Sequence, residues 1–218
     1  MEAESCEADF WRDEVRRFLP DAGGALVDAL GYVCCPVCKV LSDVSYEYFC
    51  RLPRRWSDEP AMRRAVCRAR GFCSAHTWLL ARVQGQITIA QVCADVLDAV
   101  PTPPAPAEPC PVCRLRALVE KALVEHLGRR LADADARRHY ARLPGVCYPH
   151  LEQLLRVDLA PGARETLLSC QEARRVELVG NLRSFAQKNA PPAKWTRTDD
   201  ENRAPQRALL KLVGDKEA

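Results

Sequence analysis

Cys35-Pro36-Val37-Cys38 and Cys110-Pro111-Val112-Cys113 are two copies of one short motif, 75 positions apart. Each copy is followed by a second motif of the form Cys-x-x-His. Cys73-Ser74-Ala75-His76 follows the first copy, and Cys147-Tyr148-Pro149-His150 follows the second. Each half of the chain therefore supplies three cysteines and one histidine, which is the ligand set of a closed tetrahedral zinc site.

The motifs predict two zinc ions per chain. The predicted ligands are Cys35, Cys38, Cys73, His76, Cys110, Cys113, Cys147 and His150. The stretch between the two motifs of a half is long enough for two helices of about 15 residues, each about 22 Å long. A helix leading out and a helix leading back would return the second motif to the first, so we expect the ligands to pair within each half. The spacing alone leaves pairing across the halves open.

Two other chemistries compete with zinc. Three cysteines and one histidine can also hold an iron–sulfur cluster. Cys-Pro-x-Cys is a dithiol redox motif where it opens a helix after a β-strand, but no strand pattern precedes either copy. Cysteines that only fill a core would leave the two motif histidines unexplained.

The composition favours an all-α fold. The chain is rich in Ala, Leu, Val and Arg, and Ala, Leu and Arg lose little free energy on entering a helix. Only Gln86-Ile87-Thr88-Ile89 resembles a strand, and it is short. We expect helices over residues 8–19, 24–33, 37–52, 58–70, 88–99, 112–132, 134–142, 149–157, 162–188 and 205–213, and one after His76. Two of these helices carry a predicted apolar stripe. In 112–132 it consists of Leu115, Leu118, Val119, Ala122, Leu123, Leu127 and Leu131, and in 162–188 of Leu168, Val176, Val179, Leu182 and Phe185.

The repeated motifs indicate two tandem helical units, each a helical hairpin closed by a metal site. Residues 1–100 would form the first unit and 110–189 the second. Residues 101–109 hold five prolines and would form a stiff linker. Residues 190–218 would be a loosely ordered tail that ends in a short helix. We expect the helix that begins near residue 37 to stop before Pro53, because the residue before a proline avoids the α conformation.

Several other residues need an interpretation. Cys34, next to Cys35, is most simply a packing residue, although it could exchange into the metal site under oxidation. Cys6 lies in an acidic leader, where we expect it to be exposed. We interpret the remaining cysteines as core residues. Three tryptophans would be core or hairpin-tip packing residues, and two histidines would occupy solvated or core positions on helices. These residues are Cys50, Cys67, Cys93, Cys170, Trp11, Trp56, Trp78, His126 and His139.

Charge and motif content limit the function classes. The net charge is +3, but arginines gather in residues 51–70 and 129–142, which could offer a basic face to nucleic acid. Phosphate-binding, dinucleotide-binding and nucleophile-elbow motifs are absent, so nothing but the metal argues for an enzyme. The first residues show neither the basic stretch nor the apolar run of a signal peptide, and no uncharged run approaches the length of a membrane span. We therefore expect a cytoplasmic protein with metal-bound thiols.

The paired motifs, with the ending Ala208-Leu209-Leu210-Lys211-Leu212-Val213-Gly214, resemble a bacterial family of uncharacterised cysteine-rich helical proteins. The resemblance covers most of residues 31–214. It implies an all-helical cytosolic protein and no established activity, and it carries over to the eight motif residues.

The sequence thus predicts a zinc-binding helical scaffold or interaction module whose partner is another protein. A thiol-based redox or metal sensor is the alternative, and nucleic-acid binding through the arginine-rich arms is the third hypothesis.

Overall fold

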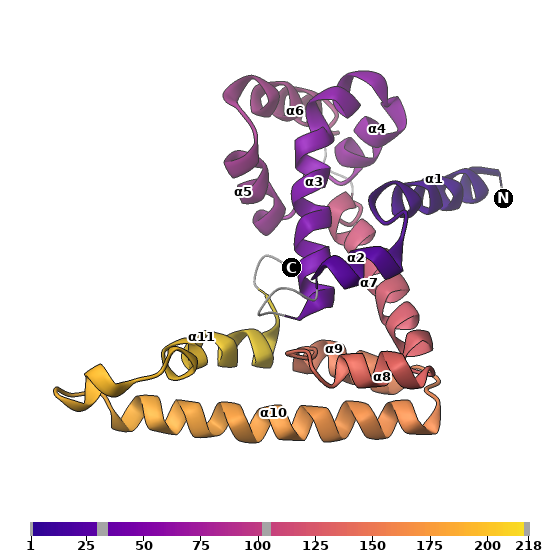
Figure 1. Ribbon diagram of the computed structural model, residues 1–218. Coiled ribbons are helices and arrows are strands. Elements are labelled where there is room, and N and C mark those ends of the chain that lie inside the picture. The colour runs from indigo at the N-terminus through magenta and orange to yellow at the C-terminus, as the bar shows by residue number, and fades with distance from the viewer. Residues whose placement is uncertain (1, 30–34, 102–105, 216–218) are drawn as a thin grey trace. The chain divides into compact units, whose positions relative to one another are not determined.

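The described part of the chain is helical throughout. The computed structural model describes residues 2–29, 35–101 and 106–215, which form eleven α-helices, one 3-10 turn and no strand (Figure 1). The predicted all-α class is confirmed. Cys34, the end of the predicted helix 24–33 and four residues of the proline-rich linker lie outside the described residues, as does the side chain of Cys6.

The helices follow in the order α1 (Glu2–Phe18), α2 (Ala22–Ala29), α3 (Pro36–Asp58), α4 (Pro60–Arg68), α5 (Ser74–Val83), α6 (Gln86–Asp98), α7 (Pro111–Arg130), α8 (Ala134–Tyr140), α9 (Tyr148–Arg156), α10 (Pro161–Gln187) and α11 (Asp199–Val213). The 3-10 turn, η1 (Ala193–Thr196), lies between α10 and α11. The strand-like run at residues 86–89 is the first turn of α6.

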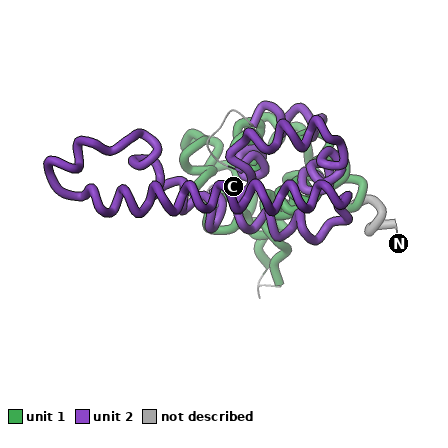
Figure 2. The backbone as a smooth tube through the Cα atoms, turned by 60° about the horizontal axis from the view of Figure 1, so that its bottom comes forward, with its two compact units in different colours: residues 1–20, 41–121 green, residues 21–40, 122–218 purple. Residues whose placement is uncertain are grey.

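The described chain divides into two compact units (Figure 2). Unit 1 contains residues 1–20 and 41–121, and unit 2 contains residues 21–40 and 122–218. The boundaries fall inside α3 and α7, so the first turn of α3 belongs to unit 2 and the first half of α7 to unit 1. Each unit therefore takes segments from both halves of the sequence, whereas we expected units over 1–100 and 110–189.

Helix α3 does not stop before Pro53, and the expectation that it would was wrong. Pro53 lies inside α3, which continues to Asp58. Proline has no N–H, so the carbonyl of Phe49, four residues earlier, loses its helical partner. The side-chain amide of Gln84, just after α5, donates to this carbonyl at 2.5 Å. A side chain from another part of the chain thus satisfies the group that the proline leaves open.

Helix α11 begins earlier than expected. We predicted loose chain up to residue 204, but the helix starts at Asp199 and contains Pro205. Thr198 caps it with a reciprocal capping box: its hydroxyl accepts from the Glu201 N–H, and the Glu201 carboxylate accepts from the Thr198 N–H. The Thr-x-x-Glu spacing was the sequence signal for this start.

Aromatic side chains form much of the unit 1 core. Tyr48 and Phe49 of α3 are fully buried, and their rings contact Phe18 and Phe72 with centroids 5.0–6.1 Å apart. A buried ion pair joins α1 to α3, because Arg55 donates twice to the Glu14 carboxylate at 2.7 and 2.8 Å. A buried charge is tolerated only when it is paired in this way.

Leucines of α7, α9 and α10 supply the unit 2 core. The predicted apolar stripe of α7 is largely correct. Leu123, in the unit 2 part of the helix, and Leu131, just after it, are buried; in the unit 1 part Leu115 and Val119 are buried and Leu118 is exposed. The stripe predicted for α10 is partly wrong. Its buried residues are Ala163, Leu167 and Gln171, whereas Leu168 and Val176 are exposed.

Four cysteines and one tryptophan do not occupy the core as predicted. Cys50 and Cys93 are exposed, and Cys67 and Cys170 are only partly buried. Trp78 is 70% exposed, whereas Trp11 and Trp56 are buried. Each sits on a helical segment, but helical position alone does not say which face of a helix is covered.

None of the helices in the described ranges is long and apolar enough to cross a membrane.

Candidate metal centres

The eight motif residues gather into two groups of four. Cluster A consists of Cys35, Cys38, Cys147 and His150 in unit 2, and cluster B consists of Cys73, His76, Cys110 and Cys113 in unit 1. Within each group, one donor atom from every residue lies within 4.8 Å of the other three. The structure thus brings all eight predicted residues together as two Cys3His sets.

The donor atoms are spaced as a tetrahedral zinc ion requires. Zn–S bonds of about 2.3 Å and Zn–N bonds of about 2.0 Å put two sulfurs about 3.8 Å apart and sulfur and nitrogen about 3.5 Å apart. In cluster A, Cys38 and Cys147 Sγ are 3.7 Å apart, and the sulfurs lie 3.0–3.4 Å from His150 Nδ1. In cluster B, Cys73 and Cys113 Sγ are 3.6 Å apart, and the sulfurs lie 3.2–3.6 Å from His76 Nδ1. Disulfides would need sulfurs about 2 Å apart.

Every ligand pair lies at the start of a helix. In each pair, the backbone carbonyl of the first cysteine accepts the first hydrogen bond of the helix. The donor is the N–H of the residue four positions later. The second ligand of each pair is three positions after the first and therefore faces the same side of the first turn. Cluster A joins the N-termini of α3 and α9, and cluster B joins those of α5 and α7. Unpaired N–H groups and the positive end of the helix dipole favour thiolates at both places.

The ligands pair across the sequence halves, which corrects our expectation of pairing within each half. That expectation assumed outgoing and returning helices of equal length. Helix α3 has 23 residues and is about 35 Å long, but α4 has nine and is about 14 Å long. Helices α7 and α8, with 20 and seven residues, are just as unequal. The returning helix is too short to bring the Cys-x-x-His motif back to the Cys-Pro-Val-Cys motif of its own half.

A glycine two positions before each Cys-x-x-His motif sets the turn into it. Gly71 and Gly145 have φ angles of +91° and +77°, which side chains disfavour. At Gly145 a Cβ would also lie 2.5 Å from Arg174 Nη1. Cys73 and Cys147 then have nearly identical extended conformations, with φ of −65° and −68°. The two motifs are thus presented in the same way.

The end of α11 covers cluster A, a role that the sequence did not reveal. A Cβ on Gly214 would lie 3.1 Å from Cys38 Sγ, so a side chain here would crowd the sulfur. The Asp215 N–H bonds to Cys38 and favours its thiolate. Lys211 donates to the carbonyl of Val146 and to Gln171, both at 2.7 Å. Burial lowers the pKa of Lys211 to about 8, although the thiolates of Cys35 and Cys147 act to raise it. At neutral pH the Lys211 ammonium is therefore mostly protonated, and it places a positive charge near these sulfurs.

The pKa values of two thiols in cluster A are shifted in opposite directions. Hydrogen bonds to Cys147 and Cys35, together with burial, raise the pKa of Cys38. For Cys35, burial opposes ionisation, but hydrogen bonds from the neighbouring thiols and His150 outweigh it and lower the pKa. Thiolates this close repel one another, so a dication bound among them would replace their protons.

Cluster B has a neutral imidazole and one favoured thiolate. Burial and the nearby Arg116 lower the pKa of His76 to about 4, which leaves its ring uncharged at neutral pH. Burial raises the pKa of Cys73, but bonds from backbone N–H groups at the start of α5 and from the neighbouring thiols outweigh it, and the pKa falls. Neutral imidazole and thiolate are the forms that bind a metal.

The two clusters differ in their exposure. All four residues of cluster A are buried, none more than 5% exposed. In cluster B only His76 is buried, whereas Cys73 and Cys110 are partly buried and Cys113 is exposed. Cluster B is therefore the one that a reagent in solution can reach.

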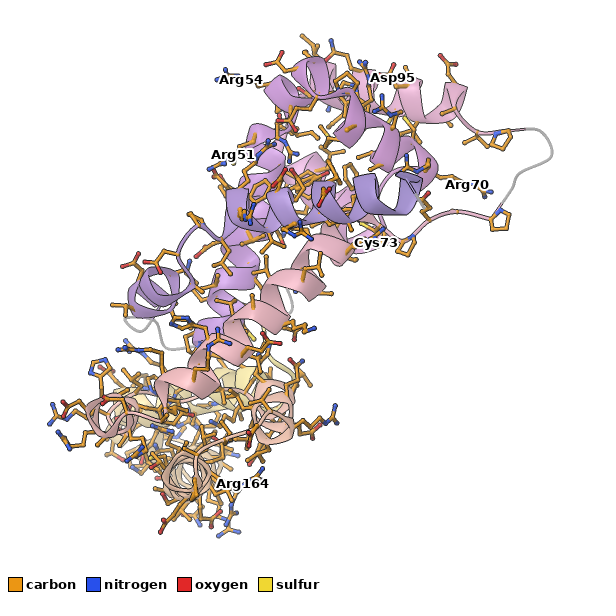
Figure 3. All side chains as sticks on the ribbon, turned by 90° about the vertical axis from the view of Figure 1, so that its right-hand side faces the viewer. Arg51, Arg54, Arg70, Cys73, Asp95 and Arg164 are labelled. Atoms are coloured by element: carbon orange, nitrogen blue, oxygen red, sulfur yellow. The ribbon has the colours of Figure 1, made fainter. Side chains whose placement is uncertain are left out.

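Several arginines of the two arginine-rich arms pair with carboxylates of the protein. Arg51 and Arg54 point outward from α3 (Figure 3), yet Arg51 pairs with Glu47 at 2.6 Å. Arg55 is buried against Glu14, and Arg68 pairs with Glu108 at 2.6 Å. In the second arm Arg138 pairs with Asp135. These pairs reduce the free positive charge of the arms, and nucleic-acid binding through them stays a prediction.

No protein family, curated protein or solved structure matches this chain. The resemblance to a bacterial family of cysteine-rich helical proteins stays a prediction.

Proposed function

We propose that the chain is a zinc-binding helical protein in which clusters A and B each hold one structural ion. The spacing of the donor atoms carries this proposal, because sulfurs 3.6–3.7 Å apart around an imidazole nitrogen suit a tetrahedral ion. Each cluster provides four ligands, so no coordination position remains for a substrate. The ions would act as staples, each joining two helix N-termini within its own unit, and the protein would serve as a cytoplasmic scaffold for a protein partner.

Elemental analysis of the purified, desalted protein tests the metal. We expect about two zinc per chain and no absorption in the visible range. A brown preparation that contains iron would show that the chain holds an iron–sulfur cluster and not zinc. A protein that holds no metal, yet melts at the same temperature with and without added zinc, would contradict the proposal.

The exposure of cluster B favours a second candidate, a thiol-based redox sensor. Two cluster B thiolates, their sulfurs 3.6 Å apart, could lose two electrons to hydrogen peroxide and form a disulfide. The O–O bond of the peroxide would break, and two protons would complete two water molecules. The ion held by cluster B would then be released.

Mild peroxide treatment with a colorimetric zinc indicator tests the sensor. We expect one ion per chain to be released first, and Cys113→Ser to abolish this early phase. Equal release from both clusters, or thiols that do not react at that dose, would rule out the sensor and leave the structural role intact.

A further inference from the structure

Unit 2 contains a cavity of about 500 Å³ that neither metal cluster occupies. Volumes of about 300–1,000 Å³, with an apolar lining and few polar groups, are typical of small-molecule sites. The apolar wall includes Leu26, Val27, Leu127, Leu131 and Leu143. The polar groups are Asp21, Asp133, Asp135, Arg130, His126 and His139.

Two adjacent glycines shape one wall of this cavity. A Cβ on Gly23 would lie 3.2 Å from His126 Nε2, and a Cβ on Gly24 would lie 2.5 Å from Asp21 Oδ2. Side chains at these positions would press on the imidazole and the carboxylate. Gly23 thus lets α2 lie close to His126, and Gly24 leaves room for the Asp21 side chain at the start of the helix.

Part of the cavity lining lies next to cluster A in the sequence. Pro36, which lines the cavity, lies between the ligands Cys35 and Cys38. Tyr140 and Leu143 line it from the segment that leads to Cys147. Both ligand pairs of cluster A thus adjoin residues that line the cavity. An ion bound by these ligands would restrain the lining, so the zinc-loaded protein is the form to test.

The polar groups of the lining are net acidic. Three carboxylates and one guanidinium line the cavity, and one of the carboxylates, that of Asp135, pairs with Arg138. Burial together with Arg129 and Arg130 lowers the pKa of His126, which keeps its ring neutral at pH 7. Asp21 accepts from the Gly23 N–H at 2.9 Å, and Asp133 accepts from the Ala136 N–H at 2.9 Å. Each of these two bonds uses a single carboxylate oxygen.

We propose that this cavity binds a small apolar molecule that carries a cationic nitrogen. The apolar body would lie against the leucine-lined wall, and the nitrogen would lie at the carboxylates of Asp21 and Asp133. This inference rests on the cavity of unit 2 and goes beyond the structural role of the zinc ions.

Two probes with the same ring and opposite charge test the proposal: 1-naphthylmethylamine, which is a cation at pH 7, and 1-naphthoate. Titration calorimetry on the zinc-loaded protein should show at least tenfold tighter binding of the amine. Val27→Trp places a large side chain at the cavity and should weaken binding at least tenfold. Val176→Trp, at an equally exposed valine of α10 outside the cavity, should leave it unchanged.

Charge variants separate recognition of the cation from apolar contact. Asparagine caps helices as well as aspartate does, so Asp21→Asn with Asp133→Asn removes two charges and keeps the caps. We expect this double variant to lose at least fivefold in affinity for the amine. Asp158→Asn with Asp199→Asn removes two charges elsewhere in unit 2 and should change nothing.

Three results would overturn the cavity proposal: no binding of the amine at millimolar concentration, equal binding of the naphthoate, or equal effects of the two tryptophan variants. Zinc content measured on the same samples keeps the two proposals apart. A protein with two zinc ions that binds no amine refutes the cavity site alone, and a zinc-free protein that binds the amine refutes the zinc role alone.

Discussion

Single residues decide how closely the backbone approaches the sulfurs of cluster A. Gly214 has φ +79° and ψ −171°, a conformation that is essentially restricted to glycine, and it lies directly over Cys38 Sγ. Lys211, one turn earlier, places a cation near the same sulfurs. The last turn of α11 therefore lies against cluster A, although it supplies none of its four Cys and His side chains.

Gly214→Ala should weaken metal retention at cluster A only. The backbone strain is on the order of 1–3 kcal/mol, and the new Cβ would press on Cys38 Sγ. Zinc transfer to a chelator, followed with time, should show one ion released at least several-fold faster and the other unchanged.

Gly180→Ala is the matched control, because a Cβ there meets no atom within 4 Å and alanine favours a helix interior. Unchanged release from Gly214→Ala would show that α11 does not cover the cluster.

At the scale of the element, two helices contain a proline in their interior, where proline normally disrupts a helix. Pro53 leaves the Phe49 carbonyl without its helical donor, and the side chain of Gln84 replaces that donor. Pro205 lies in α11, and the Thr198–Glu201 capping box stabilises the N-terminus of this helix. The side chain of Gln84 thus compensates for Pro53, whereas the capping box fixes the start of α11 by satisfying N–H groups and not the carbonyl that Pro205 leaves open.

Gln84→Ala should destabilise the protein by about 1–3 kcal/mol, the cost of a buried carbonyl without a partner. In a Pro53→Ala background the same substitution should cost much less, because the alanine restores the backbone N–H donor. Urea denaturation of the four proteins of this cycle, all zinc-loaded, measures the difference. An equal loss in both backgrounds would show that the amide of Gln84 does not serve the Phe49 carbonyl.

The ion pair at the start of α11 should not depend on pH in the neutral range. Hydrogen bonds from Lys188 and Ser184 of the α10 end and from the Thr198 N–H lower the pKa of Glu201 to about 2. The carboxylate therefore contributes its full stability above its ordinary pKa of about 4.5. That contribution is lost only as the pH falls from about 4.5 toward 2.

Glu201→Gln keeps the capping hydrogen bonds and removes the charge. We expect a lower melting temperature than that of the unaltered protein, with a constant difference from pH 8 to 5.5. A difference that shrinks within this range would mean that Glu201 titrates at a higher pH than this network implies.

At the scale of the whole molecule, pairing across the halves determines which cysteines act together. Cys35 and Cys147 share cluster A, although 111 residues of sequence separate them. Cys35 and Cys73 belong to different clusters, although both lie in the first half. A structural zinc site contributes on the order of 10 kcal/mol of apparent folding free energy, so the choice of partner governs stability.

Paired substitutions test this arrangement. Cys35→Ser with Cys147→Ser should leave one tightly bound zinc per chain, because both changes fall in cluster A. Cys35→Ser with Cys73→Ser should leave none. Elemental analysis and the intensity of the cobalt-substituted spectrum measure both. The opposite result, no zinc in the first variant and one ion in the second, would restore pairing within each half.

The residues of both clusters were predictable from sequence because their chemistry is local. Cys-x-x-Cys and Cys-x-x-His place two donors on one helical turn, whatever the rest of the chain does. The stripe of α7 was predictable for a similar reason, since apolar residues at steps of three and four define one helix face. Trp78 and Cys93 were misplaced because burial depends on what packs against a helix.

The sequence by itself determined that the chain is helical and that eight cysteines and histidines form two Cys3His sets. Short-range spacing and helix propensity are sufficient for both conclusions. The tertiary structure alone decided the partners. Because α3 runs on through Pro53 and α4 is short, the second motif cannot return to the first, and each Cys-Pro-Val-Cys meets the Cys-x-x-His of the other half.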